Sequence, residues 1–475
     1  MAERYEMIVG LEVHVELKTE TKIFCSCPTI FGAEPNTQCC PVCMGLPGAL
    51  PTLNRRVVEY AIKAGLATNC RIARQTGLDR KNYFYPDLPK AYQISQYDRP
   101  LCYGGWLDIE SGGEKKRIGI TRIHIEEDAG KLIHDGERGT MIDCNRCGVP
   151  LIEIVSEPDI RSAQEAKLYL KKLRSLMLYA GVSDCKMNEG SLRCDVNISV
   201  RPVGSSELGE RCEIKNLNSF AFAAKAIEYE FERQTALLER GERLTRETRR
   251  FDASSGKTYA MRSKESAEDY RYFPEPDLPP LTVSEETVAR LANELPRLPD
   301  LRAEEYISKY SLSEYDSEII TSDMALADYF EAAVRTSAYP KLLANILISE
   351  ILGRVEQEDF YCPISPENLA EIADMSGEGL INSSTAKKLI KRLWLSDEPP
   401  REVVMREELF QINDREALTE AILAVIRADA RVVADYKSGR TVAAKSVVGR
   451  VMSATGGRAN PALLGELTQE ILKSQ

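Results

Sequence analysis

Apolar and polar residues alternate with a period of two in four stretches of the first part of the chain, at 8–17, 118–127, 151–155 and 193–200. This period is typical of β-strands, in which successive side chains point to opposite faces of a sheet. Two segments with helical spacing interrupt the strands. One begins at Ser162, an N-cap with Glu165 three residues later, and the other begins near Ser219. A β-sheet with a few helices is therefore predicted.

The pattern changes after the proline-rich segment 273–280, which we interpret as the end of this first domain. Beyond it, apolar residues recur every three or four positions, which predicts helices. A second break falls at Glu398-Pro399-Pro400, and Asn460-Pro461 has the form of an N-cap followed by proline at the first helical position. We predict an α+β protein with a β-sheet domain at 1–292, an all-helical domain at 293–406 and a small helical tail domain at 407–475.

The 475-residue chain has the composition of an ordinary globular protein, with 43% hydrophobic and 28% charged residues. No apolar run approaches the roughly 18 residues that a membrane helix needs. The first six residues carry charges where a signal peptide requires an apolar run. We therefore expect a cytoplasmic protein that does not associate with membranes.

Carboxylates and a histidine share faces of the predicted strands. Alternation places Glu12 and His14 on one face of the first strand and Asp195 on one face of a later strand. Glu213 shares a face of another short strand with a lysine two residues later. Most such patterns belong to the solvated face of an antiparallel sheet, and this interpretation stays open at this point.

Glu153 favours chemistry, because it lies in the middle of the almost wholly apolar segment 151–155. A buried carboxylate is costly unless it meets a metal ion, a lysine or an arginine. Divalent cations such as Mg²⁺ bind several oxygen ligands, and Glu126-Glu127-Asp128 on a neighbouring segment could supply more of them. Because no glycine-rich phosphate-binding loop follows a predicted strand, metal-assisted phosphoryl transfer would need a different kind of site.

Five of the thirteen cysteines fall within residues 25–43. Cys25 and Cys27 form one turn-sized pair and Cys40 and Cys43 form another, a spacing that favours a structural zinc site. Cys39 precedes Cys40 directly, so the third ligand stays open between them, although the two-residue spacing favours Cys40. A separate C-x-x-C pair further along the chain is interpreted as coincidental.

The net charge of −11 argues against non-specific coating of nucleic acid by the whole surface. The tail nevertheless holds six cations against one acid between residues 431 and 460: Arg431, Lys437, Arg440, Lys445, Arg450 and Arg458. This local excess favours contact with an RNA backbone, although a solvated helix face has the same pattern. The basic helix with Lys167, Lys171, Lys172 and Arg174 is the alternative RNA-binding element.

Residues 142–154, with the sequence IDCNRCGVPLIEI, resemble the signature of the B subunits of aspartyl/glutamyl-tRNA amidotransferases. Further similar motifs are GLEVHV at 10–15, DRKNYFYPD at 79–87, DYRYFPEPD at 269–277 and the stretch 448–461. The resemblance spans nearly the whole chain. Only Cys144 and Cys147 depart from the signature, at positions where it tolerates variation.

The resemblance implies a cradle-shaped catalytic domain, a helical domain and a tail that binds tRNA. It implies that ATP phosphorylates the side-chain carboxylate of aspartate or glutamate mischarged on tRNA(Asn) or tRNA(Gln), and that ammonia then displaces the phosphate. A separate amidase (A) subunit would release the ammonia from glutamine and deliver it through a channel, and a small linker (C) subunit would complete the heterotrimer. The sequence does not distinguish aspartyl-tRNA from glutamyl-tRNA as the substrate.

The resemblance also implies roles for individual residues. The family's magnesium ligands correspond to Glu12, His14, Glu127 and Glu153, with Asp195 and Glu213 nearby. Lys81 lies in a segment that the family places near the ammonia path. Because some relatives lack the cysteines, the zinc would be structural.

Two other functions are weighed against this one. A non-catalytic tRNA-binding scaffold of the same complex would have no reason to bury Glu153 beside Glu12 and His14. A self-sufficient glutaminase would need a serine or cysteine nucleophile with a matching general base, which the sequence does not offer.

Overall fold

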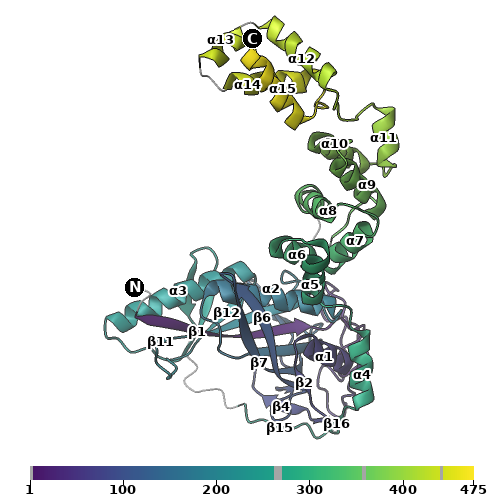
Figure 1. The fold of residues 1–475 in the computed structure, drawn as a ribbon. Coiled ribbons are helices and arrows are strands. Elements are labelled where there is room, and N and C mark those ends of the chain that lie inside the picture. Colours follow the sequence, from purple (N-terminus) through teal and green to yellow (C-terminus); the bar gives the residue numbers. More distant parts are fainter. Residues whose placement is uncertain are drawn as a thin grey trace. The chain divides into compact units, whose positions relative to one another are not determined.

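The computed structural model describes residues 4–137, 139–261, 270–355, 360–429, 431–438 and 442–474, without the side chains of Asn216 and Lys437. The chain forms two compact units, one ending at Leu298 and the other beginning at Pro299 (Figure 1). None of the helices in the described ranges has the length and apolar character needed to cross a bilayer.

The first unit is built on a nine-stranded sheet with the order β14-β13-β12-β11-β1-β10-β7-β6-β2. Its neighbouring strands are antiparallel except for β12 and β13, which are parallel. The strands are β1 (Tyr5–Glu16), β2 (Arg71–Ile72), β6 (Cys102–Ser111), β7 (Glu114–Glu127), β10 (Pro150–Ser156), β11 (Leu192–Pro202), β12 (Cys212–Leu217), β13 (Glu247–Asp252) and β14 (Lys257–Ala260). The four alternating stretches of the sequence are β1, β7, β10 and β11, which are neighbours at the centre of the sheet, so the strand prediction is confirmed.

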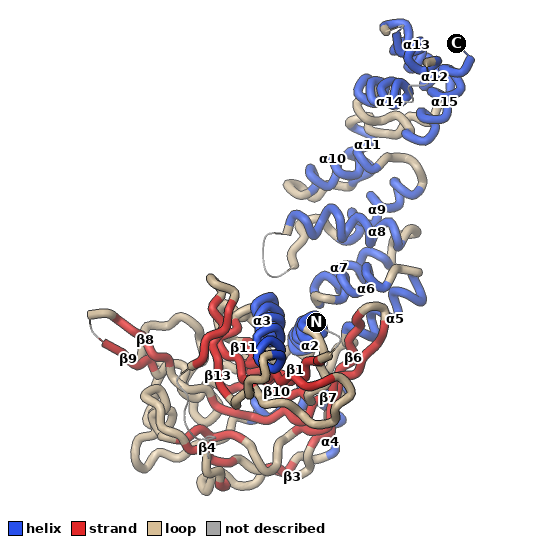
Figure 2. Tube along the Cα trace, turned by 90° about the vertical axis from the view of Figure 1, so that its left-hand side faces the viewer, coloured by secondary structure: helices blue, strands red, loops and turns tan. Residues whose placement is uncertain are grey.

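Three small sheets accompany the large one, with the orders β15-β4-β5, β16-β3 and β8-β9. Their strands are β3 (Gln75–Thr76), β4 (Asp79–Asn82), β5 (Tyr92–Ser95), β8 (Lys131–Asp135), β9 (Gly139–Asp143), β15 (Phe273–Pro274) and β16 (Leu281–Thr282). Figure 2 shows β8 and β9 as a hairpin that projects from the unit.

The proline-rich segment 273–280 does not end the first unit, contrary to the sequence-based interpretation. Phe273 pairs with Arg80 of β4, and the Arg80 guanidinium donates to both carboxylate oxygens of Glu275 at 2.7 and 2.8 Å. The chain then forms β16 and the helix α4 (Glu285–Glu294), which packs on the core of the same unit. Backbone pairing and a buried ion pair therefore tie this segment to the sheet unit.

Three helices cover one face of the large sheet: α1 (Arg55–Ala67), α2 (Ala163–Tyr179) and α3 (Phe220–Glu239) (Figure 1). Both predicted N-caps are confirmed, because the Ser162 hydroxyl accepts from the Glu165 N–H and the Ser219 hydroxyl accepts from the Phe222 N–H. The covered face is apolar and holds the main hydrophobic core of the unit. The opposite face carries the polar residues, and the sheet β15-β4-β5 reaches it through Lys81.

The second unit has only helices as its regular elements in the described residues. They are α5 (Pro299–Tyr310), α6 (Glu314–Thr321), α7 (Met324–Val334), α8 (Pro340–Ile346), a π-helical turn (Leu347–Ile351), a 3₁₀ turn (Leu352–Arg354), α9 (Pro366–Gly377), α10 (Ser383–Leu393), α11 (Pro400–Arg406), α12 (Arg415–Ala428), α13 (Arg431–Lys437), α14 (Val442–Ala454) and α15 (Pro461–Ser474). Asn460 caps α15, as predicted, by accepting from the backbone N–H of Ala462 and Leu463.

These helices enclose two apolar cores, one within residues 306–404 and the other within 418–472. The α+β fold class is thus confirmed. The two domain boundaries, at 292/293 and 406/407, stay predictions, because the compact units divide the chain only after Leu298.

Candidate functional site

Two histidines and two carboxylates meet on the polar face of the large sheet. His14 of β1 pairs directly with Glu153 of β10, which pairs in turn with His124 of β7. The Nε2 atoms of His14 and His124 lie 3.4 and 3.5 Å from Glu153 Oε2. Glu126, two residues after His124, reaches the same face, with Oε2 at 3.4 Å from His124 Nε2. We call His14, His124, Glu126 and Glu153 the carboxylate–histidine cluster.

Both carboxylates of the cluster are buried and held ionised. Burial alone would raise their pKa values, but positive charge outweighs it. The ammonium of Lys81, 3.6 Å from Glu126 Oε1, and the His124 hydrogen bond lower the pKa of Glu126 to about 2. The charge of His124 and the hydrogen bond of His14 hold the pKa of Glu153 well below its usual range. The site therefore presents two buried anions.

The cluster has a ligand set suited to a hard divalent cation. One ligand atom each from His14, Glu126 and Glu153 lies within 4.8 Å of the others. Mg²⁺ is commonly bound by one or two carboxylates together with water and substrate phosphates. His124 Nδ1 is buried and has no hydrogen-bond partner among the described residues, so the cluster is not saturated by the protein alone.

A second group of charges lies beside the cluster on β1, β11 and β12. Glu12 of β1 lies opposite Asp195 in the register with β11. The Glu12 carboxylate accepts a hydrogen bond from the Asn197 amide at 2.8 Å. The Lys215 ammonium lies 3.6 Å from Asp195 Oδ2 and 3.1 Å from Glu213 Oε1. Burial, followed by neighbouring negative charge, raises the pKa of Glu12. We call Glu12, Asp195, Glu213 and Lys215 the lysine-bridged group.

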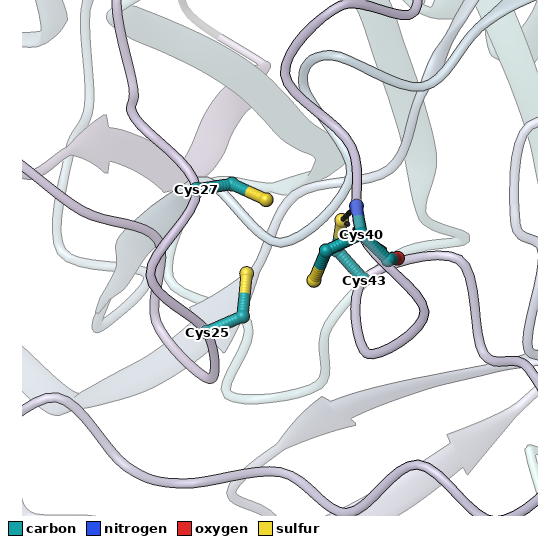
Figure 3. A group of neighbouring side chains, drawn as sticks. All are labelled: Cys25, Cys27, Cys40 and Cys43. Atoms are coloured by element: carbon teal, nitrogen blue, oxygen red, sulfur yellow. Dashed lines mark hydrogen bonds between the residues drawn. The ribbon is translucent and has the colours of Figure 1, made fainter.

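The cysteines form a separate centre. Cys25 and Cys27 lie on one loop and Cys40 and Cys43 on another, and their sulfur atoms turn toward one another within 4.8 Å (Figure 3). The Cys25 thiol donates to the Cys43 sulfur, and this contact lowers the pKa of Cys43 to about 4. A closed set of four cysteine sulfurs is the donor set of structural zinc sites.

The sheet, the cluster and the cysteine loops can be compared with known proteins. Residues 7–289 match the GatB/GatE catalytic domain, and residues 328–472 match the GatB domain. The chain is 52% identical over 476 aligned positions to the B subunit of the aspartyl/glutamyl-tRNA(Asn/Gln) amidotransferase of Caldicellulosiruptor saccharolyticus, covering 99% of each chain. The corresponding protein of Thermodesulfovibrio yellowstonii is 50% identical over 473 positions, covering 99% of this chain and 100% of the relative.

The chain belongs to the family of aspartyl/glutamyl-tRNA(Asn/Gln) amidotransferase B subunits. The resemblance seen in the sequence is thereby confirmed, and with it the assignment to a subunit of a tRNA-dependent amidotransferase. The comparisons do not identify site residues, so the candidate residues rest on the geometry described above.

Glu127, the magnesium ligand that the family resemblance implied, is not in the carboxylate–histidine cluster. It follows Glu126 directly and therefore points to the opposite face of β7. There it pairs with Lys90 and accepts from the Ile94 N–H at 2.8 Å. It lines a cavity of about 110 Å³ together with Lys90 and Cys43. Among the carboxylates of this segment, the structure brings Glu126 to His14.

Sequence reasoning did not single out His124. It named Glu126 as one of three possible oxygen ligands, whereas the family resemblance pointed to Glu127, and the structure brings Glu126 into the cluster. The alternation of β7 carries the missing signal, because Ile123 and Ile125 are buried in the apolar core. Residues 124 and 126 must then share the polar face. Lys81 does meet the cluster, but it arrives from a different sheet, which strand periodicity cannot reveal.

The geometry of the cysteines fits the predicted set, and it favours Cys40 over Cys39 at the third position, while the zinc ligands stay a prediction. Cys40 belongs to the four-sulfur group, whereas the Cys39 sulfur lies 3.8 Å from Asn145 Oδ1. The C-x-x-C pair Cys144 and Cys147 is buried next to the cysteine loops but is not part of the four-sulfur group.

The six tail cations are not equivalent. Arg431 and Lys445 are exposed on α13 and α14. Arg450 pairs with the Asp429 carboxylate at 3.0 Å, and Arg458 donates to a backbone carbonyl oxygen. The side chain of Lys437 and the whole of Arg440 lie outside the described residues.

Proposed function

We propose that this chain supplies the phosphoryl-transfer site and the tRNA-binding tail of a glutamine-hydrolysing amidotransferase. In the first step, an oxygen of the substrate side-chain carboxylate attacks the γ-phosphorus of ATP, and ADP leaves. In the second step, ammonia attacks the resulting acyl phosphate and inorganic phosphate leaves, which gives asparaginyl-tRNA(Asn) or glutaminyl-tRNA(Gln). The observation that carries the proposal is a buried pair of carboxylates, Glu126 and Glu153, within 3.4 to 3.5 Å of histidine nitrogens on a sheet face.

A magnesium ion would be held by His14, Glu126 and Glu153, with Glu12 of the lysine-bridged group beside them. When bound, such an ion neutralises charge on the ATP phosphates and on the transferred phosphoryl group. The lowered pKa values of Glu126 and Glu153 support this role, because both carboxylates are then negatively charged at neutral pH, as metal ligands must be. The family-based ligand Glu127 is proposed only as a neighbour on the other face of the sheet.

Two lysines supply positive charge for the acidic substrates. The Lys81 ammonium faces the cluster from β4, and nearby carboxylates raise its pKa despite its burial, so it stays charged. Lys215 holds Asp195 and Glu213 in the neighbouring group. We propose that both orient the substrate carboxylate and the phosphates, and that Lys81 also borders the ammonia path that the resemblance implies.

The four cysteines would hold a zinc ion with a structural role, because four thiolates leave no open position for chemistry. The partners would be a separate amidase (A) subunit, a small linker (C) subunit and mischarged tRNA, with the tail helices contacting the tRNA backbone. We propose a cytoplasmic location for this complex.

The alternative function is a non-catalytic tRNA-binding scaffold. A scaffold would not require Glu126 and Glu153 to be buried in their ionised forms, since apolar residues of similar size are often as stable in such positions. The burial of these anions beside His14 and His124 therefore favours the catalytic function.

The decisive experiment replaces Glu153 by glutamine in the reconstituted complex and supplies ammonium chloride in place of glutamine. Glu153→Gln keeps the shape but removes a negative charge, so we expect loss of ATP-dependent amide formation on mischarged tRNA while the complex still assembles. Glu157→Gln, at an exposed position just after the same strand, is the matched control. Full amidation by Glu153→Gln with ammonium would show that the cluster serves ammonia delivery instead.

A further inference from the structure

Two tyrosines form a parallel stack at the rim of the polar face. The rings of Tyr97 and Tyr272 have centroids 4.2 Å apart and planes inclined by 11°. Tyr97 is 53% exposed. We call this pair the tyrosine stack.

The backbone around the stack is firmly held. Tyr97 follows β5, and its N–H donates to the Asp79 carboxylate at 2.8 Å. Tyr272 precedes β15, whose attachment to β4 is secured by the Arg80–Glu275 ion pair. Both tyrosines therefore flank strands of one small sheet, and a ligand that stacks on them would meet a surface already in place.

The stack is linked to the carboxylate–histidine cluster by two sets of contacts. The Arg122 guanidinium donates to the Tyr97 carbonyl oxygen at 3.2 Å and lies 5.7 Å from the ring centroid. Arg122 precedes His124 by two residues and so shares its face of β7.

On the other side, the Tyr270 ring meets Tyr272 edge-on at 5.9 Å. The Lys81 ammonium lies 5.2 Å from the Tyr270 ring and 3.6 Å from Glu126. The tyrosine stack thus has a cation on each side, Arg122 next to Tyr97 and Lys81 beyond Tyr270, and Lys81 reaches the buried Glu126.

An aromatic surface with cations beside it suits the base and the phosphates of a nucleotide. Bases stack on aromatic side chains with little dependence on their hydrogen-bonding groups, and guanidinium groups pair with phosphates. We propose that the tyrosine stack binds the adenine base of ATP, with Arg122 beside its phosphates. This inference rests on the proposed function and adds to it the place of the base. The terminal adenosine of tRNA offers the same base, but it would not place a triphosphate between Arg122 and the cluster.

The test measures the KM values of the reconstituted complex for ATP and for mischarged tRNA, with ammonium chloride as the nitrogen donor. Tyr97→Ala should raise the KM for ATP by roughly 5- to 100-fold, the effect of removing one stacking partner. It should leave kcat and the KM for tRNA nearly unchanged. Tyr97→Phe keeps the ring and should behave as the wild type, and Tyr315→Ala removes an exposed tyrosine of the second unit as a control.

Binding is checked without turnover by the fluorescence of 2-aminopurine riboside triphosphate, which stacking quenches. Wild type and Tyr97→Trp should quench the probe, and Tyr97→Ala should not. If Tyr97→Ala raised only the KM for tRNA, the stack would bind the terminal adenosine of tRNA. If Tyr97→Ala changed neither KM value nor the quenching, the stack would bind neither ligand. Either result overturns the inference while wild-type amidation is intact. Loss of the proposed function would instead appear as a wild-type complex without ATP-dependent amidation.

Discussion

The Lys22 ammonium lies 3.7 Å from the Cys43 sulfur, although the lysine is completely buried. It also donates to the carbonyl oxygens of Gln38 and Cys144, at 2.7 and 3.4 Å. A buried cation is costly unless it is paired. Four thiolates would carry more negative charge than one zinc ion neutralises, so Lys22 is placed to offset part of the excess at the proposed zinc site.

The first prediction concerns this lysine. Lys22→Met keeps the length of the side chain but removes its charge, so zinc should leave the protein about 10- to 100-fold faster, as for other partners of metal ligands. Release is measured with a coloured chelator, starting from protein with about one zinc per chain. Lys18→Met, at an exposed position, is the control. Equal release from Lys22→Met and wild type would contradict the role of Lys22, and protein with less than about a tenth of a zinc per chain would contradict the centre itself.

The second prediction separates two adjacent carboxylates. Glu126→Gln should raise the magnesium concentration for half-maximal amidation at least about tenfold. Loss of a residue that only supports a metal ligand already has an effect of this size. Glu127→Gln should leave the magnesium dependence unchanged, because Lys90 and the Ile94 N–H hold Glu127 on the opposite face. The magnesium titration is done with ammonium as the nitrogen donor. The reverse order of effects would restore Glu127 as the ligand.

The third prediction concerns acid stability. Glu230 of α3 is fully buried and is bound by the guanidinium groups of Arg233 and Arg249 and by the Thr258 hydroxyl. Burial opposes ionisation, but the hydrogen bonds from Arg233 and Thr258 lower the pKa of Glu230 below its ordinary value of 4.5. Its stabilising effect is therefore fully present above that value and is lost as the pH falls through the lower, folded-state value.

Glu230→Gln should accordingly reduce the free energy of unfolding by about 2 kcal/mol at pH 7, the cost of disturbing charged hydrogen bonds. The difference from wild type should shrink below pH 4.5. The free energies of unfolding are measured by urea denaturation, followed by circular dichroism, at pH 7 and below pH 4.5. Glu228→Gln, at an exposed position of the same helix, is the control. A difference that grows toward low pH would mean that Glu230 is not an ionised partner of the two arginines.

The fourth prediction concerns the tail. Deleting the chain from Arg431 would remove most of the apolar core within 418–472, so point substitutions are the sharper test. Exchanging the exposed Arg431 and Lys445 for alanine should raise the KM for mischarged tRNA. It should also reduce the slope of log KM against log salt by about 0.7–0.9 for each phosphate that is no longer neutralised. Glutamine hydrolysis by the partner should not change. An unaltered KM and slope would move RNA binding to the basic residues of α2.

Local patterns predicted much of this molecule because they depend on neighbouring residues. The alternation in β1 and β10 placed His14 and Glu153 on faces that the structure brings together, and the caps of α2 and α15 follow from Ser162 and Asn460. Contacts between distant segments were not predictable in this way. Lys81 reaches Glu126 only because β4 belongs to a second sheet.

The proline-rich segment shows the same limit of local patterns. Its composition is typical of a linker, yet Glu275 is bound by Arg80 from much earlier in the chain. Nothing in the sequence near either residue indicates this pairing. Composition alone therefore made the segment resemble a domain end, whereas the tertiary contact ties it to the sheet unit.

The two ends of strand β7 should differ strongly in how well they tolerate an inserted or deleted residue. At its start the chain turns through Gly112 and Gly113, both with positive φ, where an extra residue would enlarge an exposed loop. At its end, one inserted or deleted residue between Ile123 and Glu126 would exchange the two adjacent glutamates between the faces of the sheet. A screen of single-codon insertions along this strand should recover active variants only from the turn. The position of the tolerated insertions would then show how far amidation activity depends on the register of β7.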